Sequence, residues 1–437
     1  MRKLFITVLL LLSCQTFSQV QEYNLQNGLK ILIQEDHRAP IVVSMIWYNV
    51  GSADEPGGIT GVSHAIEHLM FKGTPRYPLG VFSKTIAAIG GQSNAFTNND
   101  YTAFYEKTAA SQLGTLLELE ADRMQNLLLD PQEFSREIKV IQEERRLRTD
   151  DNPQALAFER FLATAHLSAP YHHPVIGWMH DLQQMTVNDV KKWYQTYYAP
   201  NNATLVIVGD VQADKVHQLA QKYFGAIPAR KIPKRKSYQE PPSLGPKEVR
   251  IENNVKLPIF MAGYLVPGIT TADKPYEPYA LELIAGILDA GESARFAKKL
   301  IRGSHIASGA STYYNLYARY QTQFIVYGAP SQQGTLAKLQ SGLFEELEDL
   351  KKNRVSEKEL QRIKNQIIAQ KVYEKDSIFG QANEIGLLET VGLGWKKAEQ
   401  YTQAINEITP QQIQDTARHY FQEQNRTIAT LVPRSKE

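Results

Sequence analysis

Hydrophobic and polar positions repeat with two different periods along this chain. Short runs rich in Val, Ile, Trp and Tyr, bounded by Gly, Asn and Asp, have the pattern of strands. Longer stretches with apolar residues three and four positions apart have the pattern of helices. The expected strands are 30–34, 41–50, 94–97, 101–105 and 204–208. The expected helices are about 111–128, 130–148, 214–224 and 279–289. This mixture predicts an α+β fold in which sheets are backed by helices.

One segment of the chain occurs twice. Residues 186–204 align without gaps on 409–427, and an apolar strand follows in both copies. A stretch with five prolines among Lys and Arg, 228–247, has the composition of a linker. We therefore expect an N-terminal half at 19–227 and a similar C-terminal half at 248–437.

The motif His-Ala-Ile-Glu-His, which begins at His64, carries the most distinctive chemistry. On a helix, His64 and His68 share one face, and Glu67 can reach the same point. Two neutral imidazoles and a general base are the minimum set for a zinc-activated water, and H-x-x-E-H is the inverzincin motif. The alternative is two partly buried histidines and a solvated glutamate. Either Thr60 or Ser63 is expected to cap this helix.

A second helix, expected at 130–148, places two carboxylates on an apolar face. Spacings of i, i+3, i+4 and i+7 put four residues together: Glu137, Val140, Ile141 and Glu144. Two aliphatic residues indicate that this face is buried, and buried carboxylates need partners such as a metal ion and a ligand histidine. The alternative is a surface helix whose acids pair with nearby arginines, namely Arg136, Arg145 and Arg146.

The adjacent pair His172-His173 is a weaker candidate for metal binding. Neighbouring residues on a helix point in different directions, and Pro174 interrupts the segment. We expect these histidines to lie in a loop.

Composition limits the classes of partner and of ligand. The chain has 437 residues, 43% of them hydrophobic and 22% charged, with a formal net charge of +2. Nothing in this balance indicates nucleic acid or an anionic membrane surface as a partner.

Residues 1–18 have the pattern of an export signal: a positive start, a short apolar core and small residues at the end. The only cysteine, Cys14, lies within it, so cleavage after Ser18 would leave a mature chain without thiols. Any metal must then be held by His and carboxylate side chains. An alternative is cleavage before Cys14 with lipid attachment to that residue.

Further motifs accompany H-x-x-E-H: Gly-Gln-Ser-Asn-Ala-Phe-Thr at 91–97, Glu-Ala-Asp-Arg-Met at 120–124, Val-Ile-Gln-Glu-Glu at 140–144 and Tyr-Ala-Pro-Asn-Asn at 198–202. Together they resemble the pitrilysin/insulinase family of zinc metallopeptidases, in particular its mitochondrial-processing-peptidase-like subgroup of exported bacterial type. The resemblance covers nearly the whole chain after residue 18. It implies two similar halves, each an antiparallel-rich sheet backed by helices, facing each other across a peptide chamber.

The resemblance also assigns roles to residues. It implies one Zn²⁺ per chain held by His64, His68 and Glu144, with Glu67 as the general base. Glu137 matches a family glutamate that supports a ligand histidine. The substrate would lie as an added strand on a sheet edge. The residues of that edge are Asn94, Ala95, Phe96 and Thr97.

The chain departs from the family in its second half. Many relatives carry an Arg and a Tyr there that contact the substrate, but Ile301 and Ser308 occupy those positions. Arg302 is one place away, and Tyr313 and Tyr314 follow slightly later. We therefore expect the zinc-bearing subunit of a heterodimer whose homologous partner supplies the pair; a homodimer is the alternative.

Two other interpretations stay open from the sequence. The chain could be a non-catalytic binding or assembly subunit that retains the fold. The intact set of site residues argues against this, because a site without function would be free to lose Glu67 or Glu144. Another divalent metal such as manganese could also be held by two His and one Glu. The expected location is the periplasm or cell envelope.

Overall fold

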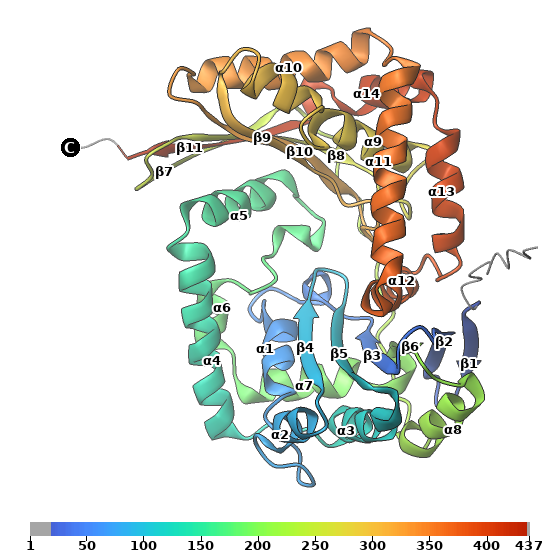
Figure 1. Cartoon of the computed structure of the whole chain (residues 1–437). Helices are drawn as coiled ribbons and strands as arrows, with labels where there is room; N and C mark the ends of the chain where they lie inside the picture. The colour runs from blue at the N-terminus through green and yellow to red at the C-terminus, as the bar shows by residue number, and fades with distance from the viewer. Residues whose placement is uncertain (1–18, 435–437) are drawn as a thin grey trace, which may run out of the picture.

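The computed structural model describes residues 19–434, so the expected export signal with Cys14 lies outside the described residues. The chain forms two halves, one above the other in Figure 1, each built on its own sheet. Within the described part, no helix is both long and apolar enough to cross a membrane.

The sheet of the first half has six strands in the order β1-β2-β6-β3-β5-β4. Only β2 and β6 are parallel, and β4 forms an edge. The strands are β1 (Gln21–Asn24), β2 (Lys30–Glu35), β3 (Ile41–Tyr48), β4 (Gln92–Thr97), β5 (Thr102–Ala109) and β6 (Ala203–Gly209). The accompanying helices include α1 (Val62–Leu69), α2 (Val81–Ala88), α3 (Leu113–Asn126), α4 (Pro131–Arg145), α6 (Met179–Gln184), α7 (Val187–Tyr197) and α8 (Ala213–Phe224).

The second half repeats this plan without a counterpart of β1. Its order is β7-β11-β8-β10-β9, and only β7 and β11 are parallel. The strands are β7 (Lys247–Asn253), β8 (Ile259–Val266), β9 (Ala307–Tyr313), β10 (Thr322–Pro330) and β11 (Arg426–Pro433). The helices include α9 (Glu277–Asp289), α10 (Leu336–Lys352), α11 (Glu357–Asp376), α13 (Lys397–Glu407) and α14 (Pro410–Tyr420).

The repeated segments form equivalent structures. Thr186 caps α7 and Thr409 caps α14, each with a capping box, and the strands that follow, β6 and β11, occupy the same place in their sheets. The expected α+β class, with two similar halves that are each a mostly antiparallel sheet backed by helices, is confirmed. Residues 228–246, between the halves, contain no helix or strand.

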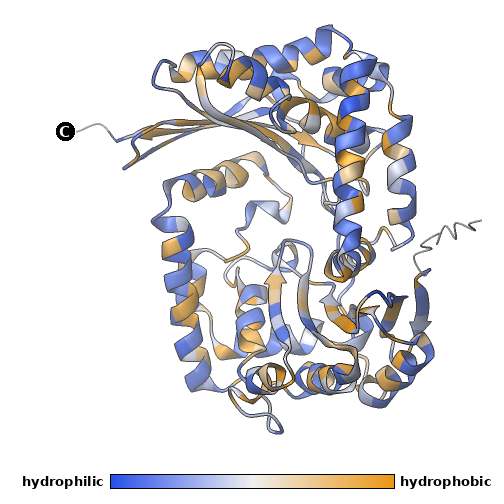
Figure 2. Cartoon of the chain, viewed as in Figure 1, coloured by the Kyte–Doolittle hydropathy of each residue, from blue (hydrophilic) through white to orange (hydrophobic). Residues whose placement is uncertain are grey.

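Each half places one helix on the sheet of the other. α5 (Pro153–Ala165) packs on β7, β11 and β8, and α12 (Ile378–Thr390) packs on β6 and β3. This exchange explains why β3 is buried on both faces and apolar at every position except Ser44. Alternate residues Val42 and Ile46 enter the core of the first half, whereas Val43, Met45 and Trp47 pack in the cluster under α12. Figure 2 shows hydrophobic residues concentrated in the strands and in the helix faces toward them.

Candidate metal centre

The start of α1 is set by a buried carboxylate. Gly61 is the N-cap residue, with a left-handed φ of 86°, and the Glu55 carboxylate accepts hydrogen bonds from the amides of Gly61 (2.6 Å) and Ser63 (2.8 Å). A negative group is favourable there because helix N-termini carry unpaired N–H groups. The expectation that Thr60 or Ser63 caps this helix is wrong: the Thr60 hydroxyl donates to Asp181 instead.

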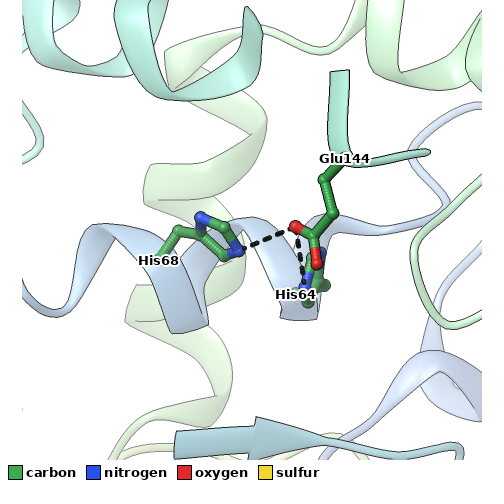
Figure 3. Close-up of side chains that lie close together, drawn as sticks. All are labelled: His64, His68 and Glu144. Carbon is green, nitrogen blue, oxygen red and sulfur yellow. Dashed lines mark ion pairs between the residues drawn. The ribbon is translucent and has the colours of Figure 1, made fainter. Parts of the chain in front are cut away.

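Two helices bring three potential ligands together (Figure 3). Nε2 of His68 lies 3.3 Å from Oε2 of Glu144, and Nε2 of His64 lies 3.8 Å from the same oxygen. The two imidazole centroids are 4.7 Å apart. The potential ligand atoms of these three side chains all lie within 4.8 Å of one another. Among the residues that the structure describes, no other group of three His, Cys, Asp or Glu side chains meets this criterion. Neither His172 nor His173 belongs to the group that does.

The orientation of His68 is set by a contact to its second ring nitrogen, Nδ1. Its Nδ1 lies 2.9 Å from Oε1 of Glu137, whose other oxygen lies 2.5 Å from Nζ of Lys72. With a proton on Nδ1 shared with this carboxylate, Nε2 has a free lone pair facing Glu144. The Glu137–Lys72 pair therefore selects the tautomer that a metal ligand needs.

His64 is also prepared to act as a neutral ligand. The ring is buried, and burial lowers the pKa of His64 to about 3. Its Nδ1 is buried and has no hydrogen-bond partner among residues 19–434. On Glu144, Oε2 faces the histidines while Oε1 is held by Arg148 at 2.6 Å.

This donor set fits zinc. Bonds of about 2.0–2.2 Å in a tetrahedron place neighbouring ligand atoms about 3.4 Å apart, close to the separations from Glu144 to the two rings. Two neutral imidazoles and one carboxylate leave a fourth position for water, as in catalytic zinc sites.

Glu67 lies beside the ligands and is tied to the edge strand. The Thr97 hydroxyl, at the end of β4, donates a 2.5 Å hydrogen bond to Oε2 of Glu67. Burial raises the pKa of Glu67, although the bond from Thr97 opposes the shift. A carboxylate with a raised pKa is better matched to accept and return a proton near neutral pH.

A cavity of about 440 Å³ opens beside these groups. One wall is the edge strand β4, another is α5, and a third is the loop that contains His172 and His173. The second half touches this wall because Tyr313 on β9 packs edge-on against Phe158 on α5, with ring centroids 6.1 Å apart. Residues lining the cavity include His64, Glu67, Ala95, Phe96, Thr97, Glu144, Phe158, Leu162, Val175 and Ile176.

The helix that carries Glu144 differs from expectation in one respect. Glu137 and Ile141 are buried, but Val140 is 51% exposed, so the prediction of a wholly buried face is wrong. Glu137 and Glu144 contact the α1 histidines, whereas Val140 lies outside the buried part of the helix. Asp130 caps α4, since its side chain accepts hydrogen bonds from two amides of the first turn.

The alternative pairing of acids with Arg136, Arg145 and Arg146 does not hold for the two central glutamates. Those arginines pair with Glu133, Glu159 and Glu143, respectively.

Sequence reasoning missed three supporting residues. Lys72 holds Glu137, Arg148 holds Glu144, and Thr97 holds Glu67 in addition to its place in the edge strand. Only the contact of Arg148 could have been predicted from the local sequence, because Arg148 lies four residues after Glu144 and this spacing brings side chains together on a helix. The other two contacts join segments that local patterns do not relate.

Fold and site together define a two-halved α+β protein with a His-His-Glu group that could hold a metal ion beside a sheet edge. A family model described as insulinase (peptidase family M16) matches residues 30–177, and one described as the peptidase M16 inactive domain matches residues 184–367.

Individual proteins agree with these matches. The zinc protease PqqE of Helicobacter pylori is 33% identical over 349 residues, covering 79% of this chain and 77% of its own. The mitochondrial-processing peptidase subunit beta of Lentinula edodes is 25% identical and covers 93% of this chain and 88% of its own.

Solved structures show the same fold. A protease from Helicobacter pylori superposes with a TM-score of 0.90 at 30% identity, covering 95% of this chain and 100% of that chain. The first half of the periplasmic protease PqqL from Escherichia coli superposes with a TM-score of 0.78 at 18% identity, over 95% of this chain and 92% of its own. The chain therefore belongs to the insulinase family of peptidases, peptidase family M16.

Proposed function

We propose that this protein is an exported zinc-dependent endopeptidase that hydrolyses peptides or unfolded segments. The observation that carries the proposal is the convergence of His64, His68 and Glu144 beside Glu67 at the edge of a sheet. Relatives named as zinc proteases support this class of reaction.

His64, His68 and Glu144 would hold one zinc ion, which when bound supplies a Lewis acid and lowers the pKa of a water to about 7. Glu67 accepts the proton of the attacking water and returns it to the leaving amine. Thr97 keeps the Glu67 carboxylate at the end of β4, where both transfers occur.

The substrate would lie along β4 as an additional strand. As an edge strand, β4 has one side available for main-chain pairing, which accepts many sequences because it uses the peptide backbone. The adjacent cavity receives a substrate side chain. The residues proposed to pair with the substrate are Asn94, Ala95, Phe96 and Thr97.

We also propose that the chain is the zinc-bearing subunit of a heterodimer. Ile301 and Ser308 stand where many relatives carry Arg and Tyr, and the neighbouring Arg302 is engaged with Glu292 at 2.5 Å. A homologous partner would supply the missing pair, so the isolated chain should be a weak peptidase. Full activity of the purified chain would contradict the heterodimer proposal if light scattering shows that the chain is a monomer.

Export is supported by the pattern of residues 1–18 and by the likeness to a protease described as periplasmic. The expected location is the periplasm or cell envelope. Mass spectrometry of the protein from fractionated cells decides between a mature chain that begins after Ser18 and one that begins with lipid-modified Cys14.

The central test is hydrolysis of a quenched fluorescent peptide by the mature chain, with metal analysis. We expect about one zinc per chain, loss of activity with a chelator, and a loss of at least about a hundredfold in Glu67→Gln. Glu144→Gln should lose zinc, whereas the adjacent, exposed Glu143→Gln should not, and it serves as the matched control. Activity that is indifferent to chelator and to Glu67→Gln would overturn the proposal.

A further inference from the structure

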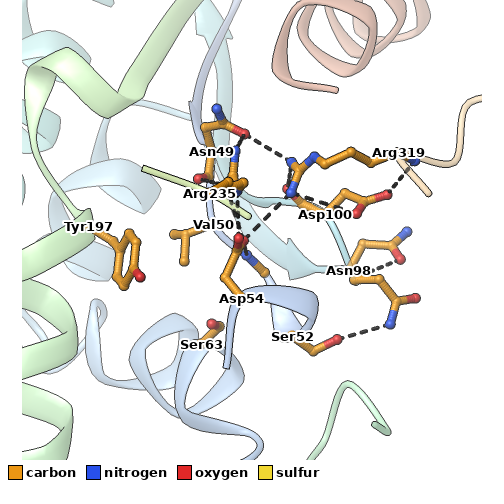
Figure 4. A network of polar contacts seen from close by, with 12 residues as sticks. Asn49, Val50, Ser52, Asp54, Ser63, Asn98, Asp100, Tyr197, Arg235 and Arg319 are labelled. Carbon is orange, nitrogen blue, oxygen red and sulfur yellow. Dashed lines mark hydrogen bonds and ion pairs between the residues drawn. The ribbon is translucent and has the colours of Figure 1, made fainter. Parts of the chain in front are cut away.

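An arginine of the second half, Arg319, reaches into a network of polar contacts in the first half (Figure 4). Arg319 follows β9 and precedes β10, and its side chain is only 11% exposed. Its Nη2 donates to Oδ1 of Asn49 at 2.9 Å and to the backbone oxygen of Asp100. Its Nη1 lies 3.6 Å from a carboxylate oxygen of Asp54 and 3.7 Å from one of Asp100.

The backbone beside Arg319 is held at the same point. Its amide donates to the Tyr171 hydroxyl at 2.9 Å, and that hydroxyl donates to Oδ2 of Asp100 at 2.7 Å. The amide of Tyr320 also donates to the Tyr171 hydroxyl, at 3.2 Å. The second half therefore grips Asp100 through a side chain and through the main chain.

A second arginine comes from the segment between the halves. Arg235 donates from Nε to Oδ1 of Asp54 at 2.5 Å and from Nη1 to Oδ1 of Asn49 at 2.7 Å. The side chains of Asp54 and Asp100 are each 6% exposed. Asp54 is compensated by Arg235 and Arg319, and Asp100 by Arg319 and the Tyr171 hydroxyl. The first half supplies the buried acids, and the rest of the chain supplies the cations.

The residues that these two arginines contact, Asn49, Asp54 and Asp100, belong to two loops that pack tightly together. The amide of Ser52 donates to the backbone oxygen of Asn98 at 3.1 Å, and the amide of Ala53 donates to that of Asn99 at 2.8 Å. A Cβ at Gly51 would lie 2.3 Å from the Asn98 oxygen, so the contact admits only glycine. A shift of Asp100 or of Asp54 would therefore displace both loops.

Each loop leads directly to the candidate catalytic groups. The turn 98–100 follows Thr97, whose hydroxyl holds Glu67. The other loop contains Glu55, which is adjacent to Asp54 and holds the amides that begin α1. The position of the second half is therefore connected to the base through one loop and to the ligand helix through the other.

We propose that Arg319 is a positioning residue: by holding Asp100 and Asn49 it sets the end of β4, so that the placement of the second half determines the placement of Glu67 through Thr97. This inference rests on the proposed peptidase function. It goes beyond that function by making the docking of the two halves a condition for a competent base.

The test uses the full mature chain with the conservative change Arg319→Lys, which keeps the charge but removes the two-armed contact. We expect kcat to fall roughly tenfold with KM within about twofold and with zinc content unchanged. Arg302→Lys is the matched control, because Arg302 is an exposed arginine of the same half that pairs with Glu292. Its kcat should equal that of the unaltered chain.

A double-variant cycle asks whether Arg319 acts through Thr97. If it does, Arg319→Lys should cost less than about twofold further in a Thr97→Val background. Losses that multiply fully, or an unchanged kcat in Arg319→Lys, would overturn the inference. If Arg319→Lys is not soluble, Asp100→Asn takes its place with the same expectations.

Hydrogen exchange supplies a readout that is independent of activity. In the chelator-treated chain, Arg319→Lys should speed amide exchange in residues 94–101, whereas Arg302→Lys should not. Absence of zinc-dependent hydrolysis in the unaltered chain would refute the proposed function alone. Unchanged exchange in residues 94–101 would refute the positioning role alone.

Discussion

The hydroxyl of Thr97 and the carboxylate of Glu67 are joined by a 2.5 Å hydrogen bond that connects the edge strand β4 to the motif helix α1. The strand proposed to hold the substrate therefore also holds the proposed base. Substrate position and base position depend on one another at this bond.

Removing this hydroxyl should impair catalysis more than binding. Thr97→Val keeps the shape of the side chain but leaves Glu67 free to rotate, so kcat should fall roughly tenfold with little change in KM. Thr97→Ser retains the hydroxyl and should stay within about threefold of the unaltered chain. Steady-state hydrolysis of a fluorogenic peptide measures both, and equal activity of Thr97→Val and Thr97→Ser would contradict the role.

The pair behind His68 should control metal affinity. Glu137→Gln or Lys72→Met disturbs the group that selects the His68 tautomer, and zinc affinity should weaken by about 10–100-fold. Competition with a chromophoric chelator measures the change. Lys139→Met, which removes an exposed lysine from the same helix as Glu137, is the control and should leave affinity unchanged.

The contact between the halves should be sensitive to a single methyl group. A Cβ at Gly386 on α12 would lie 2.0 Å from Nε1 of Trp47 on β3. Gly386→Ala should destabilise the protein by about 1–3 kcal/mol through overpacking, despite the better helix propensity of alanine. Gly309→Ala, where a Cβ meets nothing within 4 Å, is the control. Urea unfolding curves that coincide for the two variants would contradict the prediction.

Acid should weaken a second contact of α12. The Arg38 guanidinium and the Gln381 amide hold the pKa of Asp36 to about 2, although burial opposes them. Because the folded pKa is below the unfolded value of about 3.9, the stabilisation is fully present above about pH 4 and is lost as pH falls through 2.

The corresponding variant is Asp36→Asn. It should cost about 2 kcal/mol at pH 7, and the difference from the unaltered chain should shrink toward pH 2. Asp376→Asn, at an exposed carboxylate 4.0 Å from Arg38, should show little difference at any pH. Denaturant titrations at several pH values measure both, and a pH-independent difference for Asp36→Asn would contradict the assignment.

Local sequence patterns predicted much of the fold because helix spacing and helix caps depend only on residues that are close together in the chain. The i, i+4 spacing of His64 and His68 requires only a helix, the Asp130 cap requires only the first turn of α4, and the repeated Thr caps mark equivalent helices in the two halves. The exposure of Val140 was not predictable in this way. Periodicity identifies which residues share a face but not how much of that face the neighbouring helix covers.

By itself, the sequence determined the two repeated halves, the histidine pair and the residues able to ligate a metal. The resemblance to the family implied that Glu144 joins those histidines, and the tertiary structure brings the three side chains together. Only the tertiary structure decided that Thr97 reaches Glu67 and that Arg319 crosses between the halves to Asp100. The physical reason is sequence separation: side-chain spacing within one helix follows from backbone geometry, whereas contacts between distant segments follow from how whole sheets and helices pack.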